Sequence, residues 1–168
     1  RGDILINVSQ DFKNLVTHAG RAWRYKVKIT LKDGRMLELG EHDLMQDGIA
    51  VKKSTSETGQ FQAGAAIASE LTLTLNNYEG KYANVDFSDA VIIPLVGLVV
   101  EQHWKYGERP EWVQLGVFYA EKADTRGPTI PLTALDALSK FDRPYSVSGL
   151  SYPATLSRIA QDCCTNCG

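Results

Sequence analysis

The sequence predicts a mainly β fold, a β-rich α+β chain of antiparallel, barrel-like or sandwich-like subdomains with short peripheral helices. Two segments, residues 23–32 and 71–75, alternate apolar and polar residues strictly, which is the period of a strand with one buried face. Turn residues recur about every ten positions, and no alternation of strands with long helices is present. An antiparallel β architecture follows, with helices as lids.

The N-terminal elements are a helix and a hairpin. Residues 9–19 predict a short amphipathic helix, because Ser9 is suited to cap it and apolar side chains follow at helical spacing up to Gly20. Residues 23–32 form the clearest strand, and Asp33-Gly34 predicts a tight turn into a partner strand at residues 36–39. The strand also carries a cationic row, Arg24, Lys26, Lys28 and Lys32, which we interpret as a solvated face that guards against edge pairing.

The middle of the chain predicts further strands and loops. Asp47-Gly48 predicts another turn, before a strand at residues 49–53, and the polar residues 54–59 predict a loop. The leucine and threonine alternation at 71–75 predicts a second half-buried strand. Residues 82–90 are interpreted as a connecting loop, residues 91–100 as a strand buried on both faces with Pro94 at a bulge or strand start, and residues 112–119 as the next strand.

Residues 115–142 predict a hairpin closed by a short helix. Arg126-Gly127-Pro128 is the expected turn, and apolar side chains alternate from Ile130 to Ala134. From Leu135 the apolar spacing becomes helical, with Thr133 as the expected N-cap and Asp136 in the first turn. Pro131 lacks an N–H group, so the second strand is expected to lie at an edge or to end early.

Composition limits the classes of function. The chain has 168 residues, of which 18 are basic and 20 acidic, for a formal net charge of -2, so no basic excess exists to bind nucleic acid. No apolar run reaches the roughly 20 residues that a membrane span needs, so no membrane insertion is expected. We expect three regions: residues 1–53 as part of a first barrel-like subdomain, 54–150 as a second β-rich subdomain, and 151–168 as the start of a truncated C-terminal region of a longer parent chain.

The search for catalytic chemistry gives no catalytic residue and no cofactor. Motifs for hydrolases, metalloproteases, phosphate loops and dinucleotide binding are absent from the sequence. Two pairs of carboxylates, Asp86 with Asp89 and Asp136 with Asp142, are interpreted as turn formers and caps. No metal site is expected, because the weak candidates, Cys163, Cys164 and Cys167, lack a fourth ligand at the spacing of a zinc site. We interpret them as free thiols.

Three segments together resemble the N-terminal part of tail and baseplate hub proteins of long-tailed bacteriophages and prophages. They are Phe61 to Asn76, Tyr82 to Pro94, and the run from Leu115 to Asp142 with its continuation Arg143-Pro-Tyr145 and Tyr152-Pro-Ala-Thr-Leu156. The helix and basic strand at residues 9–32 fit the entry segment of such proteins. The match spans most of the chain in order and spacing.

The resemblance implies an assembly part without enzymatic activity, a hub or tail-tip protein that links the tail tube to the distal tip apparatus and lines the channel. It implies a homotrimer at the virion tail tip, assembled in the host cytoplasm, with the distal tail ring, the tape measure and a tip or fibre as partners. Candidate interface residues are Trp104, Tyr106, Trp112, Leu71, Leu73 and Leu75. The alternative function is a cell-wall carbohydrate-binding or carbohydrate-degrading domain of a tail-associated lysin, with the three aromatic residues as a sugar platform.

Overall fold

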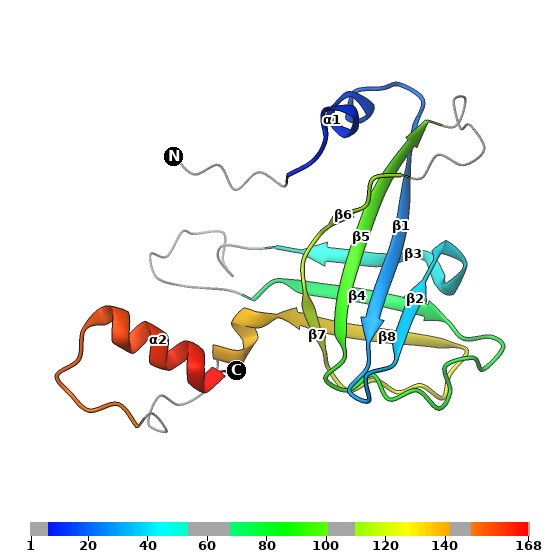
Figure 1. The fold of residues 1–168 in the computed structure, drawn as a ribbon. Helices are drawn as coiled ribbons and strands as arrows, with labels where there is room; N and C mark the ends of the chain where they lie inside the picture. Colours follow the sequence, from blue (N-terminus) through cyan, green and yellow to red (C-terminus); the bar gives the residue numbers. More distant parts are fainter. Residues whose placement is uncertain (1–6, 54–67, 101–109, 142–148, 168) are drawn as a thin grey trace.

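A computed structural model describes residues 7–53, 68–100, 110–141 and 149–167, and these form one antiparallel sheet of eight strands with a few short helices (Figure 1). The strands are β1 (Arg21–Thr30), β2 (Met36–Leu39), β3 (Leu44–Lys52), β4 (Glu70–Asn76), β5 (Val91–Val100), β6 (Val113–Gln114), β7 (Phe118–Ala120) and β8 (Thr129–Asp136). The α-helices are α1 (Gln10–Val16) and α2 (Leu156–Cys167), and η1 (Glu41–Asp43) and η3 (Ala137–Phe141) are 3-10 turns. The expected mainly β, antiparallel class is confirmed.

The strand order is β2-β1-β5-β7-β8-β4-β3, with β6 paired to β5. In Figure 1, β3, β4 and β8 run across β1, β2 and β5, so the sheet curls round on itself. Its two outermost strands, β2 and β3, are consecutive in sequence and are joined by η1. Within the described ranges the sheet stays open, since no ladder joins β2 to β3, and a closed barrel is not formed.

The core lies between the two crossing groups of strands. The strands that line the core contribute alternate residues to it, as the period of two requires. Leu71, Leu73 and Leu75 of β4 are each at most 1% exposed, and Tyr82 and Phe87 from the loop after β4 close one end of the core. The other members of the core that are at most 2% exposed are Val27, Ile29, Leu39, Ala90, Ile92, Phe118, Ile130, Leu132 and Ala134.

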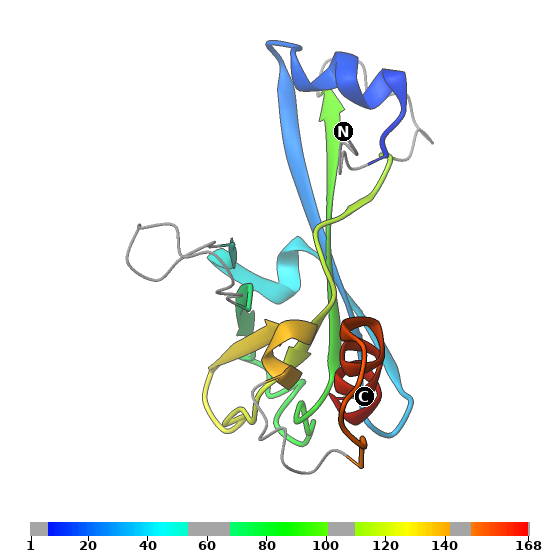
Figure 2. The same ribbon diagram turned by 90° about the vertical axis from the view of Figure 1, so that its left-hand side faces the viewer.

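The expected N-terminal helix and hairpin are confirmed. Ser9 caps α1 by accepting a hydrogen bond from the N–H group of Phe12 at 3.0 Å, and α1 packs against β5. β1 and β2 form the expected hairpin, with Gly34 at a φ of 85°, a left-handed conformation that glycine adopts without a Cβ penalty. Figure 2 shows α1 lying across the far ends of β1 and β5, which project from the rest of the sheet as a two-stranded arm.

The expected turn at Asp47-Gly48 is wrong, because both residues lie inside β3. The pairing of β3 with β4 shifts register between Leu44 and Ile49, which marks a bulge. Asp47 has a φ of 55°, and a Cβ on Gly48 would lie 2.6 Å from the carbonyl oxygen of Met45. Left-handed residues and glycines are common in both bulges and tight turns, so the same dipeptide suits either structure.

The hairpin of β7 and β8 is confirmed, but the helix after it starts later than expected. β8 continues to Asp136, and the cap of η3 is Asp136 rather than Thr133, since its Oδ1 accepts from the N–H group of Leu138 at 3.0 Å. β8 is also an inner strand, between β7 and β4. Pro131 is tolerated there because β7 pairs only with residues 134–136, so Pro131 has a ladder partner on the β4 side alone.

Two further expectations need correction. Pro94 lies in the middle of β5, between the short partners β7 and β6, so its missing N–H group interrupts neither ladder. The expected strand at residues 112–119 is divided into β6 and β7 by Leu115, Gly116 and Val117. Both corrections concern the same side of β5, where two short strands replace one long one.

The last element of the described chain is α2, which contacts η3. No helix among the described residues is both long enough and apolar enough to cross a bilayer. The expected division between residues 53 and 54 does not divide the sheet, because β1 pairs with β5 and β3 pairs with β4. Both expected subdomains therefore contribute strands to one sheet and one core.

Candidate functional site

The six interface residues expected from the sequence fall into three groups in the structure. Trp104 and Tyr106 lie outside the described residues. Leu71, Leu73 and Leu75 lie in the core of the protomer, so they are not available to another chain, and their assignment to an interface is wrong. Trp112 is partly exposed and packs on the outer face of the β1–β5 arm.

Trp112 is held on the arm by a glycine and a lysine. Gly97 of β5 has no side chain, and a Cβ built there would lie 2.9 Å from Cβ of Pro110 and 3.3 Å from the Trp112 ring. The Nζ atom of Lys26 sits 4.7 Å from the centroid of the same ring and 3.0 Å from Oε1 of Glu38. The cation therefore lies between a carboxylate and an aromatic face, and Trp112 is an intramolecular packing residue.

Gly97→Ala is expected to lower the free energy of unfolding by about 1–2 kcal/mol, because the added methyl group must displace Pro110 and Trp112 from the strand. Urea denaturation followed by circular dichroism measures the loss. Gly149→Ala is the matched control, because no atom lies within 4 Å of a Cβ built there. Equal stabilities of the two variants would contradict the packing of Trp112 on Gly97.

The inner face of the arm carries two exposed aromatic residues. Trp23 and Tyr25 point to the same face as the buried Val27 and Ile29, because residues two apart share a face of a strand. Trp23 is nevertheless 42% exposed and Tyr25 is 36% exposed, since the arm extends beyond the strands that cover the core. Such exposed aromatic residues on a strand are typical of contact surfaces.

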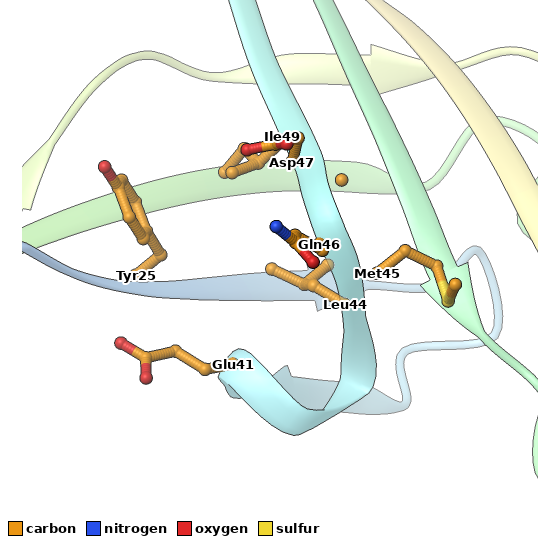
Figure 3. Close-up of a pocket in the computed structure, with 8 residues that line it drawn as sticks. Tyr25, Glu41, Leu44, Met45, Gln46, Asp47 and Ile49 are labelled. Atoms are coloured by element: carbon orange, nitrogen blue, oxygen red, sulfur yellow. The ribbon is translucent and has the colours of Figure 1, made fainter.

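A groove of about 460 Å³ opens between this face and β3. Its lining residues are Tyr25 from β1, Glu41 from η1 and Leu44, Met45, Gln46, Asp47, Gly48 and Ile49 from β3. In Figure 3, Tyr25 stands opposite the side chains of Leu44, Gln46 and Asp47, with Glu41 below. The lining combines apolar side chains with two carboxylates, Glu41 and Asp47, and Oε2 of Glu41 lies 3.4 Å from Nη1 of Arg24.

A cluster around Asp43 fixes the turn that closes one end of the groove. The Asp43 carboxylate accepts hydrogen bonds from Nζ of Lys81 and from the Tyr82 hydroxyl, both at 2.7 Å, and from the Gly40 N–H group at 3.0 Å. Burial raises the pKa of Asp43, but these three donors outweigh it and hold the pKa below its ordinary value. The same carboxylate raises the pKa of Lys81. The cluster ties η1 to the loop after β4.

Asp43→Asn is expected to destabilise the protein by about 1–2 kcal/mol at pH 7, because a neutral amide is a weaker acceptor for Lys81 and Tyr82. The folded pKa of Asp43 is depressed, so its contribution is present above the unfolded pKa of about 3.9 and is lost as the pH falls below it. Urea denaturation between pH 7 and pH 3 measures this. A stability difference between wild type and variant that does not shrink below pH 4 would contradict the role of the charge.

The carboxylates that were considered for catalysis accept hydrogen bonds that stabilise turns and caps. The Asp86 carboxylate accepts from the Ser88 N–H group at 3.0 Å, and Asp136 accepts from Ser69 and Leu138. Burial raises the pKa of Asp136, but those two N–H groups outweigh it and keep the pKa low. Both residues act as turn formers and caps, as expected, while Asp142 lies outside the described residues.

The cysteines are on α2. Cys163 is partly buried and Cys164 is exposed, and both are free thiols. The side chain of Cys167 lies outside the described part of the structure. Over the described ranges, no group of three or more His, Cys, Asp or Glu side chains is arranged to hold a metal ion. The described surface offers a groove lined by apolar side chains and two carboxylates, beside exposed aromatic residues, and such a surface suits contact with another polypeptide.

Comparison with known proteins gives a structural likeness. No protein-family model matches the sequence, and no curated protein matches it either. The fold is similar to that of a chain in a solved structure described as the virion of a native gene transfer agent particle, with a TM-score of 0.52 and 13% sequence identity. The likeness covers 89% of this chain and 52% of that chain, so this chain spans about half the length of the chain it resembles.

Proposed function

We propose that this chain is a structural component of a phage or prophage tail, a hub or tail-tip protein that links the tail tube to the distal tip apparatus and lines its channel. The observation that carries the proposal is the likeness over 89% of the chain to a chain of a virion particle. The resemblance of residues 61–76, 82–94, 115–145 and 152–156 to tail hub proteins supports the same role from the sequence. The two lines of support are independent, because one rests on the fold and the other on residues.

The proposed mechanism is assembly rather than catalysis. In this role the chain forms a homotrimer and contacts the distal tail ring, the tape measure and a tip or fibre. Trp23 and Tyr25 are exposed on the same face of one strand beside an open groove, and neighbouring exposed aromatic residues of this kind support a contact role. A net charge of -2 suits a channel wall along which DNA passes without binding.

The presence of the chain in purified virions is a direct test of the proposal. Virions released from cells that encode the chain are purified, and antibodies against the chain are used for immunogold electron microscopy and mass spectrometry. Gold at the end of the tail that is distal from the head is the expected result, with the chain assembled into particles in the host cytoplasm. Its absence from purified particles would contradict the proposal, and clearing of peptidoglycan by the purified chain would favour the lysin alternative.

A further inference from the structure

Two lysines of this chain lie between a carboxylate and an aromatic ring. The Nζ atom of Lys81 is 2.7 Å from Oδ1 of Asp43 and 5.0 Å from the centroid of the Tyr82 ring. Lys26 is placed in the same way on the outer face of the arm, 3.0 Å from a glutamate oxygen and 4.7 Å from the centroid of a tryptophan ring. The carboxylate attracts the ammonium group by its charge, and the aromatic face attracts it through its quadrupole. This pair of groups is therefore how the fold holds an ammonium group.

The groove beside β3 carries the same pair of groups. Tyr25 of β1 and Asp47 of β3 both line it, and their side chains stand opposite each other (Figure 3). Among the described residues, no lysine or arginine lies over the Tyr25 ring, and no hydrogen bond or ion pair engages the Asp47 carboxylate. The groove therefore presents the carboxylate and the ring without a cation of this chain between them.

The backbone, and not a partner of its carboxylate, fixes the position of Asp47. Its φ of 55° lies in the left-handed region, which residues other than glycine adopt uncommonly. A Cβ built on Gly48 would lie 2.6 Å from the carbonyl oxygen of Met45 and 2.8 Å from that of Thr74, so the bulge requires a glycine next to Asp47. Bulges re-aim the side chains of a strand, and the Asp47 side chain lines the groove. Backbone strain of this kind is found most often at functional positions.

The charges around the groove favour a cation. Glu41, the other carboxylate of the lining, lies 3.4 Å from Nη1 of Arg24, which balances its charge. The Asp47 carboxylate has no such balance. Leu44 and Ile49 supply apolar lining, on which the aliphatic stem of a lysine packs while its ammonium group reaches the carboxylate. A lysine side chain therefore fits the groove better than an acidic or a wholly apolar one.

We infer that the groove binds a lysine side chain of a partner polypeptide, with the ammonium group between the Asp47 carboxylate and the Tyr25 ring. The lysine stem packs on Leu44 and Ile49. Trp23 is exposed on the same face of β1, about 7 Å further along the strand, and contacts an apolar side chain of the same partner segment. The inference deepens the proposed function and rests on it, because it states the chemistry by which the chain recognises a partner of its assembly.

Two peptides that differ in one charge test the inference on the full chain. The probes are Ala-Leu-Lys-Leu-Ala, blocked at both ends, and the same peptide with norleucine, a neutral side chain of similar length, in place of lysine. Titrations followed by nuclear magnetic resonance are expected to show that the lysine peptide binds about fivefold or more tightly than the norleucine peptide. The amide signals of Tyr25 and of residues 44–49 are expected to shift. Absence of binding, equal binding of the two peptides, or shifts confined to other parts of the chain would overturn the inference.

Asp47→Asn removes the charge and keeps the bulge, because asparagine adopts the left-handed conformation as readily as aspartate. Its affinity for the lysine peptide is expected to fall about fivefold, to that of the norleucine peptide, whose own affinity stays the same. Asp89→Asn is the matched control, since Asp89 also has a positive φ, of 58°, and does not line the groove. An Asp47→Asn chain that still prefers the lysine peptide as strongly as the wild type does would overturn the inference.

Tyr25→Leu removes the ring and keeps an apolar side chain on β1. Its affinity for the lysine peptide is expected to fall by about two- to fivefold, because the attraction between cation and ring is lost. Tyr78→Leu is the control, since Tyr78 is 71% exposed and does not line the groove. The two groove variants lie on different strands, so if one fails to fold the other still tests the contact. Unchanged affinity of Tyr25→Leu for the lysine peptide would overturn the placement of the ammonium group.

Sedimentation of the chain without peptide separates a partner protein from a second copy. Wild type and Asp47→Asn are expected to self-associate equally. Weaker self-association of Asp47→Asn would mean that the groove binds a lysine of a second copy, and the inference of a separate partner would be wrong. The virion role is judged by the presence of the chain in purified particles. A chain that is present in particles but does not bind the lysine peptide would keep the proposed function and lose this inference.

Discussion

Asn77→Asp is expected to lower the free energy of unfolding by about 3 kcal/mol at pH 7, measured by urea denaturation. Asn77 is only 4% exposed. Its Nδ2 atom donates to the carbonyl oxygens of Gly127 at 2.9 Å and Thr125 at 3.3 Å, and its Oδ1 atom accepts from the Tyr82 N–H group at 2.8 Å. Aspartate keeps the acceptor for Tyr82 but puts a charged oxygen against two carbonyl groups.

The neighbouring asparagine is the control. The Oδ1 atom of Asn76 accepts from the Tyr78 N–H group at 3.2 Å, a role that aspartate fills equally well. Asn76→Asp should therefore change the unfolding free energy by less than about 0.5 kcal/mol. If both variants lose the same stability, the loss comes from added negative charge in this loop, and the two-donor role of Asn77 would be wrong.

The elements whose signals are local could be predicted from the sequence. α1 follows from its cap at Ser9 and its spacing, and the hairpin of β1 and β2 follows from alternation on both sides of Asp33-Gly34. The Asp47-Gly48 bulge could not be predicted, because its dipeptide is also a turn signal and the choice is made by pairing with β4, whose strand begins more than twenty residues later in the chain. Local chemistry sets what a dipeptide can do, and the partner strand sets what it does.

The exposure of Trp23 and Tyr25 could not be predicted from the sequence for a similar reason. Trp23 and Tyr25 have the same alternation as Val27 and Ile29, which are 0% exposed. Periodicity tells which side of a strand is apolar, but not whether another strand covers that side. The arm is uncovered because β3 and β4 cross β1 lower down, a consequence of the strand order. Equally, the alternation of residues 71–75 fits an interface as well as a core.

The core position of Leu73 leads to the other large expected effect. Leu73 is 1% exposed and is the cross-strand partner of Ile49 in β3 and of Leu132 in β8. Leu73→Ala removes side-chain atoms from a site with neighbours on both sides, so a cavity should remain, and we expect a loss of about 3 kcal/mol in the free energy of unfolding. Thr72→Ala is the control, because Thr72 is exposed on the opposite face.

Protein concentration separates the core from an interface. Stability that depends on self-association varies with concentration by mass action, whereas a cavity in the protomer costs the same at every concentration. Urea denaturation of Leu73→Ala and of the wild type at two concentrations a hundredfold apart is therefore expected to give the same difference in free energy. If the difference in unfolding free energy between wild type and Leu73→Ala disappears in dilute protein, Leu73 lies in an interface between chains. In that case β4 would have to be covered by another chain rather than by β3 and β8.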